Sequence, residues 1–192
     1  MRKKNNLKVI VTLLIVTVLC ICGVIRFFSI HSKYPQNEKV VYKMGESFVC
    51  QNAKFTITDT YMLKRMDIMN DDDLSEYLEE NSDYLKSEDL NLGLIKIIIS
   101  NTTDDEITVD LTAFHIESGA FSLQFYYPLV MYYNDCGMYI KLSKGEQKTF
   151  IAPVPISSEQ FLNYDSTDIR NRTYYLVSSL YPQKIMSEVK FN

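Results

Sequence analysis

The pattern of hydrophobic and polar positions divides the chain into an apolar N-terminal segment and a longer region where the two kinds of residue alternate. Residues 9–25 form one apolar run without a charged residue, flanked by Lys8 and Arg26, and further apolar residues extend it to Ile30. A helix needs about 20 predominantly apolar residues to cross a bilayer. The pattern therefore predicts one transmembrane helix over residues 9–30.

The charges beside this helix predict its orientation. The N-terminal side carries four basic residues, Arg2, Lys3, Lys4 and Lys8. Because basic residues favour the cytoplasmic side, we expect a cytoplasmic basic tail over residues 1–8 and an extracytoplasmic chain after residue 30.

A cleaved signal peptide is the alternative to an anchor. Cleavage requires small residues in an Ala-x-Ala-like arrangement, which Ile21-Cys22-Gly23 and Phe27-Phe28-Ser29 match poorly. A lipoprotein signal needs a small residue before its cysteine, but Leu19 precedes Cys20 and Ile21 precedes Cys22. We therefore expect an uncleaved signal anchor, with a cleaved signal as the alternative.

After a polar linker over residues 31–42, the alternation becomes that of β-strands. In the first strand, Phe55, Ile57 and Tyr61 share one face, which we expect to be buried. The predicted strands are residues 54–61, 92–100, 107–112, 121–134, 138–142, 148–154, 174–180 and 185–191. Residues 92–100 are apolar nearly throughout, as in a central strand, and Pro128 makes residues 121–134 an edge strand or two strands meeting at a bend.

Seven to nine strands at this spacing predict a mainly β protein. The simplest arrangement is an immunoglobulin-like antiparallel β-sandwich over residues 43–192, preceded by the N-terminal transmembrane helix. One segment has helical periodicity instead, with Leu74, Tyr77 and Leu78 on one side and an acidic start that suits the helix dipole. We therefore expect a helical insertion over residues 71–86.

The net charge of the sandwich restricts the class of partner that it can bind. Five of the 20 basic residues lie at or before Arg26, which leaves 15 against all 24 acidic residues, a net charge of −9. Nucleic acid is therefore excluded as a partner.

Cys50 and Cys136 lie outside the membrane and form a candidate disulfide, worth about 4 to 5 kcal/mol for so long a loop. The Lys-, Asn-, Ile- and Tyr-rich composition is typical of low-GC Gram-positive bacteria, whose exported proteins tend to avoid disulfides.

Catalytic chemistry has little support in the sequence. The two histidines, His31 and His115, have no second ligand-type residue at suitable spacing, and the common hydrolase and nucleotide-binding motifs do not occur. We expect no catalytic residue, no metal site, no cofactor and no enzymatic activity.

The acidic run from Asp67 to Asp89 is the strongest local signal. Lys86 is the only basic residue in that span. The EF-hand pattern does not fit, because Glu76 and Ser82 occupy the positions of the required glycine and glutamate. The run is either a solvated helix face or a binding surface for a basic partner or a cation. The candidate binding residues are Asp71, Asp72, Asp73, Glu76 and Glu79.

Fourteen tyrosines without tryptophan suggest a second kind of binding surface. Tyr126 and Tyr132 share the less apolar face of their predicted strand, and with Tyr133 they form a candidate platform for stacking on glycans. Tyrosine also packs half-buried on sheet surfaces, so a structural role is the alternative.

Three local patterns resemble a known family. Residues 95–100 are followed by the turn Asn101-Thr102-Thr103-Asp104-Asp105-Glu106, the turn Leu142-Ser143-Lys144-Gly145-Glu146 leads to Phe150, and Pro153-Val154-Pro155 follows. This order resembles the telokin-like, immunoglobulin-fold domains of unknown function in membrane-anchored or lipoprotein Gram-positive proteins. The resemblance covers about residues 43–191, implies the fold, and brings no agreed catalytic residues.

These observations together predict a single-pass membrane protein whose extracytoplasmic sandwich is a non-catalytic binding or accessory module. Its expected partners are the membrane and another envelope protein. The alternative is a subunit that binds envelope glycan or a cation through its acidic and tyrosine-bearing surface.

Overall fold

The computed structural model describes residues 2–33, 38–81, 89–157, 160–161 and 169–191. The chain divides into two compact units, Met1–Asn37 and Glu38–Asn192. The first contains a single helix, α1 (Arg2–Lys33), whose stretch Thr12–Ile30 is long and apolar enough to cross a membrane. One N-terminal apolar helix of this kind fits a membrane anchor or a signal sequence.

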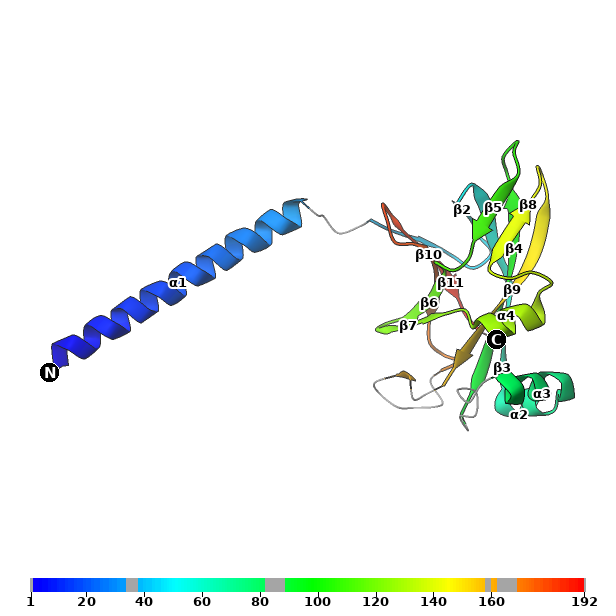
Figure 1. The fold of residues 1–192 in the computed structure, drawn as a ribbon, viewed down its shortest axis with the longest axis horizontal. Helices are drawn as coiled ribbons and strands as arrows, with labels where there is room; N and C mark the ends of the chain where they lie inside the picture. The colour runs from blue at the N-terminus through cyan, green and yellow to red at the C-terminus, as the bar shows by residue number, and fades with distance from the viewer. Residues whose placement is uncertain (1, 34–37, 82–88, 158–159, 162–168, 192) are drawn as a thin grey trace. The chain divides into compact units, whose positions relative to one another are not determined.

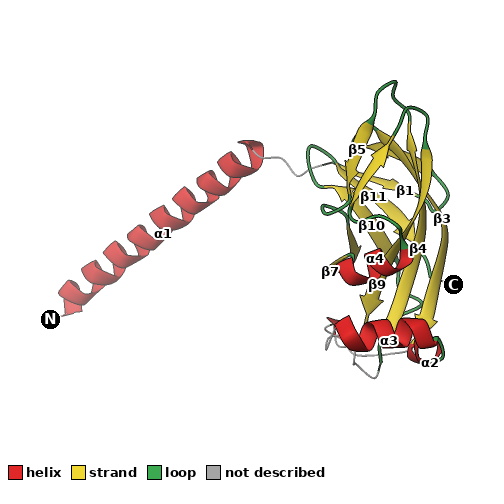
Figure 2. Ribbon diagram, turned by 45° about the vertical axis from the view of Figure 1, so that its right-hand side comes forward, coloured by secondary structure: helices red, strands yellow, loops and turns green. Residues whose placement is uncertain are grey.

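The second unit is mostly β-structure, as Figures 1 and 2 show. Its strands are β1 (Lys39–Tyr42), β2 (Ser47–Cys50), β3 (Ala53–Lys64), β4 (Asn91–Asn101), β5 (Ile107–Asp110), β6 (His115–Ser118), β7 (Phe121–Gln124), β8 (Tyr139–Leu142), β9 (Gln147–Ile156), β10 (Tyr174–Ser179) and β11 (Lys184–Val189). Three short helices complete it: α2 (Arg65–Met69), α3 (Asp72–Asn81) and α4 (Tyr127–Tyr133).

The strands form a five-stranded sheet in the order β1-β11-β10-β6-β7, a four-stranded sheet in the order β2-β3-β4-β9, and the pair β5-β8. β4 and β9 are neighbours, although β6 lies between them in sequence and belongs to the sheet of β10 and β11. The immunoglobulin sandwich divides its strands in this way, with B and E in one sheet and C, F and G in the other. The predicted β-sandwich with a minor helical insertion is therefore confirmed.

One hydrophobic core joins the two larger sheets. Phe55, Ile97 and Phe150 come from the four-stranded sheet, and Ile116 and Leu176 from the five-stranded sheet; all are fully buried in the same cluster. β4 pairs along its length with β3 and β9, so the predicted central strand is confirmed.

Asn101, at the end of β4, brings two of the family-like turns together. Its side-chain amide donates hydrogen bonds to the carbonyl oxygens of Asp105, Leu142 and Ser143 at 2.7, 3.1 and 3.0 Å. Its Oδ1 accepts a hydrogen bond from the backbone N–H of Thr103 at 2.8 Å. The residue is 4% exposed. A buried amide with these four bonds ties the β4–β5 turn to the β8–β9 turn.

A β-bulge in β3 makes one predicted orientation wrong. Ile57 pairs with Ile97 while Asp59 pairs with Lys96, so Thr58 is an extra residue. Because side chains alternate along a strand, one extra residue exchanges the faces that follow it. Thr60 is consequently buried, with its hydroxyl donating to the carbonyl of Lys190, whereas Tyr61 is 50% exposed rather than buried.

Residues 121–134 are not one long strand. β7 ends at Gln124, and α4 follows, with Pro128 in its first turn. Proline fits the first turn of a helix because the N–H that it lacks has no partner there. Asn134 then fixes the helix end to β9, since its side chain bonds both backbone polar groups of Ile151 at 2.8 and 2.9 Å.

Two predicted boundaries also change. The linker was expected to extend to residue 42, but β1 begins at Lys39 and pairs in parallel with β11. The helical insertion was expected to begin at residue 71, but α2 already follows β3 at Arg65. The predicted helix after Asn81 lies outside the described residues. β1 is placed by its pairing with the distant strand β11, and α2 by the packing of Ile68 in a cluster with Leu92 and Leu129.

We predict that Ile97→Ala lowers the free energy of unfolding by about 2 to 5 kcal/mol, the usual cost of truncating a buried large aliphatic side chain. Ile97 is 0% exposed in the core between the sheets. Thr108→Ala, on the exposed side of β5, is the control and should change it by less than about 0.5 kcal/mol. Urea denaturation of residues 38–192 measures both. Equal, small effects would contradict the assignment of the core.

Candidate functional site

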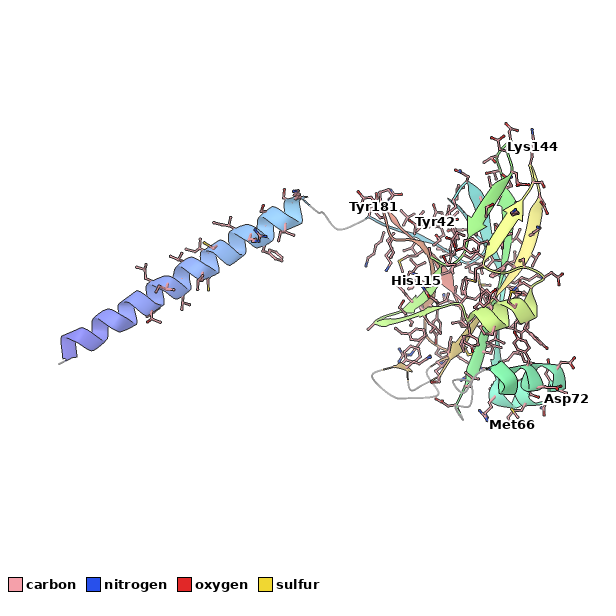
Figure 3. All side chains as sticks on the ribbon, in the orientation of Figure 1. Tyr42, Met66, Asp72, His115, Lys144 and Tyr181 are labelled. Atoms are coloured by element: carbon pink, nitrogen blue, oxygen red, sulfur yellow. The ribbon has the colours of Figure 1, made fainter. Side chains whose placement is uncertain are left out.

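The helices α2 and α3 lie at one end of the sandwich, away from the β8–β9 turn that carries Lys144 (Figure 3). α3 begins at this position because the carboxylate of Asp71 accepts a hydrogen bond from the backbone N–H of Leu74 at 3.0 Å. An aspartate in this place satisfies an otherwise unpaired N–H of the first helical turn. Leu74 and Leu78 then point inward into a second, smaller apolar cluster with Leu92 and Leu129.

Because these leucines anchor the inner side of α3, its acidic residues remain outside. Asp71, Asp72, Asp73 and Glu76 are all exposed. None of the ion pairs within the described part of the chain involves any of the four carboxylates. Glu79 belongs to α3 as well, but its side chain lies outside the described residues. The predicted acidic face therefore exists over the first half of the helix.

Exposed methionines lie next to these carboxylates. Met66 is 72% exposed and Met69 is 48% exposed on α2, the helix that immediately precedes α3. Ile68, between them, is buried in the same small cluster as Leu74. Methionine is unbranched and polarizable, and it is common on surfaces that bind other proteins.

The predicted tyrosines gather where α3 meets α4. The hydroxyl of Tyr77, from α3, donates a hydrogen bond to the carbonyl of Pro128 in α4 at 2.8 Å. The rings of Tyr77 and Tyr132 lie 5.0 Å apart, and Tyr132 meets Tyr133 edge to face at 5.0 Å. Tyr126, directly before α4, packs half-buried against the same apolar cluster. The rings thus pack on one another and do not form the flat strand platform that the sequence suggested.

The acidic and tyrosine residues therefore form one surface, although the sequence presented them as two separate candidates. Burial and the charges of Asp71 and Asp73 raise the pKa of Tyr132. Burial, Tyr132 and Asp71 also raise the pKa of Tyr133. We call this region the acidic–tyrosine surface; it comprises Asp71, Asp72, Asp73, Glu76, Tyr77, Tyr126, Tyr132 and Tyr133.

The acidic–tyrosine surface combines exposed charge with aromatic and apolar side chains. Within the described residues, no three His, Cys, Asp or Glu side chains are arranged to hold a metal ion. The exposed carboxylates instead present negative charge beside half-buried phenol rings and exposed methionines.

Cys50 and Cys136 are both free thiols, so the candidate disulfide is not formed in this structure. The thiol of Cys50 donates to the carbonyl of Ser178 on β10 at 3.5 Å. Burial raises the pKa of both thiols above the ordinary value. Both side chains are half-buried and pack against the main core, where they contribute apolar contacts.

A cluster of charged side chains surrounds His115, and it was not predicted from the sequence. Nε2 of His115 lies 3.0 Å from Oε1 of Glu117, and Nζ of Lys184 lies 2.5 Å from Oε2 of the same carboxylate. Burial opposes ionisation of Glu117, but the bonds from Lys184 and His115 outweigh it and lower its pKa. Residues two apart on a strand share a face, so the pair His115–Glu117 was recognisable in the sequence; Lys184 comes from β11 and was not.

We predict that Asp73→Asn lowers the pKa of Tyr132 toward its ordinary value of 10.0, because one of the charges that disfavour the phenolate is removed. In the wild type the folded state holds this proton more tightly than the unfolded state, so stability should fall as pH rises above about 10. An NMR pH titration of the tyrosine rings, assigned with Tyr132→Phe, measures the pKa.

The matched control for this titration is Asp104→Asn, which removes a carboxylate from the β4–β5 turn. It should leave the pKa of Tyr132 unchanged. An identical pKa in the wild type and in Asp73→Asn would contradict an effect of the Asp73 charge on Tyr132.

Comparisons with known structures give weak likenesses. The ycdA protein of Bacillus subtilis, described as a lipoprotein, is 13% identical over 75% of this chain, with a TM-score of 0.49; the match spans only 38% of that protein. The yjhA protein of Bacillus subtilis is 13% identical over 79% of this chain and 99% of its own, with a TM-score of 0.41. An uncharacterized β-sandwich protein of Clostridium difficile is 12% identical over 81% of this chain and 98% of its own, with a TM-score of 0.43.

Sequence comparison identifies the family. No curated protein matches the chain. The family model described as "Domain of unknown function (DUF5028)" matches residues 31–185, which is most of the chain and includes nearly the whole sandwich. The chain therefore belongs to the DUF5028 family of domains of unknown function.

Proposed function

We propose that this protein is a membrane-anchored, non-catalytic accessory module of a Gram-positive cell envelope. Its telokin-like, immunoglobulin-like sandwich is held outside the membrane by α1 and binds a basic segment of another envelope protein. The contact is made by the acidic–tyrosine surface together with Met66 and Met69. The observation that carries the proposal is the group of exposed carboxylates without ion pairs among the described residues, beside exposed methionines.

The anchor is supported by the apolar stretch Thr12–Ile30 and by the charges around it. Four basic residues lie in the first eight positions. Ile21 and Phe27, two residues before Gly23 and Ser29, stand where an Ala-x-Ala-like cleavage site needs a small residue. An uncleaved helix with its N-terminus in the cytoplasm places residues 38–192 outside.

We predict that a reporter active only outside the cytoplasm, fused after Asn192, is active and remains with the membrane fraction. The charge difference across α1 sets this orientation. Fractionation and a reporter assay measure it. Activity confined to a cytoplasmic reporter would contradict the orientation, and release of a chain trimmed near residue 30 into the medium would contradict the anchor.

The chemistry of the surface supports binding rather than catalysis. A general acid or base works best with a pKa near the operating pH, but the pKa values of Tyr132 and Tyr133 are raised from an ordinary value that is already high. The raised pKa values of Cys50 and Cys136 likewise make these thiols weak nucleophiles at neutral pH.

Complementary charge would speed the encounter with a basic partner, while the methionines and tyrosines would add apolar contact area. The described carboxylates of α3 are exposed, whereas Leu74, Leu78 and Tyr77 pack on the small apolar cluster. The charges can therefore be removed without altering the core, which makes the proposal testable by mutation.

We predict that Asp72→Asn, Asp73→Asn and Glu76→Gln together greatly reduce capture of a partner by the full chain in a cross-linking pulldown from membranes. Thermal stability should remain nearly unchanged, because all three side chains are exposed. With the captured partner, the association rate should fall and the dissociation rate should change less, and added salt should weaken the wild-type complex.

The matched control removes three charges from the other end of the sandwich: Asp104→Asn, Asp105→Asn and Glu106→Gln. These residues are also exposed. The control should retain capture. A partner whose binding is indifferent both to the α3 changes and to ionic strength would contradict the proposal and would assign the acidic residues to a solvated helix face.

A further inference from the structure

A separate pocket lies at the turn between β6 and β7. It has a volume of about 230 Å³ and is lined by Ser118, Gly119, Ala120, Phe121, Gln160, Phe161 and Arg172. None of these residues belongs to the acidic–tyrosine surface, so the pocket is independent of the proposed function. Figure 1 shows the β6–β7 hairpin that forms one wall of it.

Two aromatic rings and one guanidinium form the interior of the pocket. The rings of Phe121 and Phe161 pack with their centroids 4.7 Å apart. The guanidinium carbon of Arg172 lies 4.2 Å above the ring of Phe161. This is a cation–π arrangement, which holds one face of the guanidinium against the ring and leaves its N–H groups directed outward along the edge.

The hydrogen-bonding capacity of Arg172 is not used by the described part of the protein. Its Nε is buried and has no hydrogen-bond partner. None of the ion pairs among the described residues includes this arginine. A buried donor without a partner is uncommon in proteins and often marks the position of a bound group.

The neighbouring charged residues that the structure describes have other partners. Glu117, adjacent to the pocket residue Ser118, is bonded to Lys184 and His115. Arg170 donates to the carbonyl of Met62 at 3.0 Å. The hydroxyl of Ser118 donates to the carbonyl of Thr173 at 3.0 Å. Arg172 is thus a cation in a pocket whose described walls supply no counter-charge, within a domain that is acidic as a whole.

We propose that this pocket binds a small carboxylate with a planar or apolar body. A guanidinium binds carboxylate through two parallel hydrogen bonds, and the rings of Phe121 and Phe161 would cover the body of the ligand. The pocket is smaller than the pockets that bind drug-sized ligands, so its ligand must be compact. The ligand class is therefore an aromatic or short aliphatic monocarboxylate.

The test uses the full chain in detergent micelles and benzoate as the probe, followed by saturation-transfer NMR of the benzoate protons. Empty micelles provide the background, and benzamide, which has the same shape without the charge, tests the role of the carboxylate. Benzoate should bind saturably, and benzamide should bind at least about tenfold more weakly, because a hydrogen bond to a charged group is worth about 1.5 kcal/mol or more.

Variants assign the binding to Arg172. Arg172→Gln should weaken benzoate binding at least about tenfold, and Arg172→Lys, which keeps the charge but loses the planar fork, should weaken it less. Arg170→Gln is the matched control, since it removes the same charge two residues away and should change the affinity by less than about twofold. Thermal unfolding of each variant verifies that it is folded.

Three outcomes would overturn the proposal: no saturable benzoate binding to the wild type, equal binding of benzoate and benzamide, or unchanged binding in a folded Arg172→Gln variant. If Arg172→Gln does not fold, Arg172→Lys and the comparison with benzamide decide the question. Neither result depends on α3, so failure here would leave the proposed docking surface unaffected.

Discussion

The pairing of β4 with strands on both sides is the constraint on which the rest of the sandwich depends. β4 pairs with β3 from Asn91 to Asn101 and with β9 from Asn91 to Ser100, and its core-facing side chains are buried. Each end then organises different structure. Asn101 joins the two turns at one end, and Leu92 joins the small cluster that seats α3 and α4 at the other. A shift of β4 by one residue would exchange its buried and exposed faces and disturb both ends.

The carboxylates at the two ends of the sandwich differ in whether cations lie beside them. At the β8–β9 turn, Lys144 lies 2.6 Å from Asp104 and Lys148 lies 3.3 Å from Glu146, so carboxylates have cations beside them. Such exposed pairs add little stability, but they neutralise local charge. On α3, the exposed Asp72, Asp73 and Glu76 take part in none of the ion pairs among the described residues. The charges of Asp71 and Asp73 instead act on Tyr132. This asymmetry leaves negative charge without a paired cation on α3, and the proposed binding of a basic partner rests on it.

Short-range patterns predicted elements well when both the pattern and the packing were regular. Residues 92–100 and 148–154 lie in β4 and β9 because nearly continuous apolar or alternating residues suit paired strands. The pattern failed where one residue changed the outcome. The single extra residue in β3 turned Tyr61 outward, and Pro128 began a helix in a segment whose alternation also fitted a strand. Neither a bulge nor the choice between helix and strand in so short an apolar segment is specified by periodicity alone.

The sequence by itself determined the apolar N-terminal helix, the mainly β class, the buried central strand and the acidic face of α3, because each follows from residues close together in the chain. Only the tertiary structure decided which distant groups meet. It placed Tyr77 against Tyr132, Lys184 against Glu117, and Arg172 above Phe161. One of these contacts joins two strands, one joins two helices and one joins two segments outside the strands. Local hydrophobic patterns carry no information about which of these elements meet.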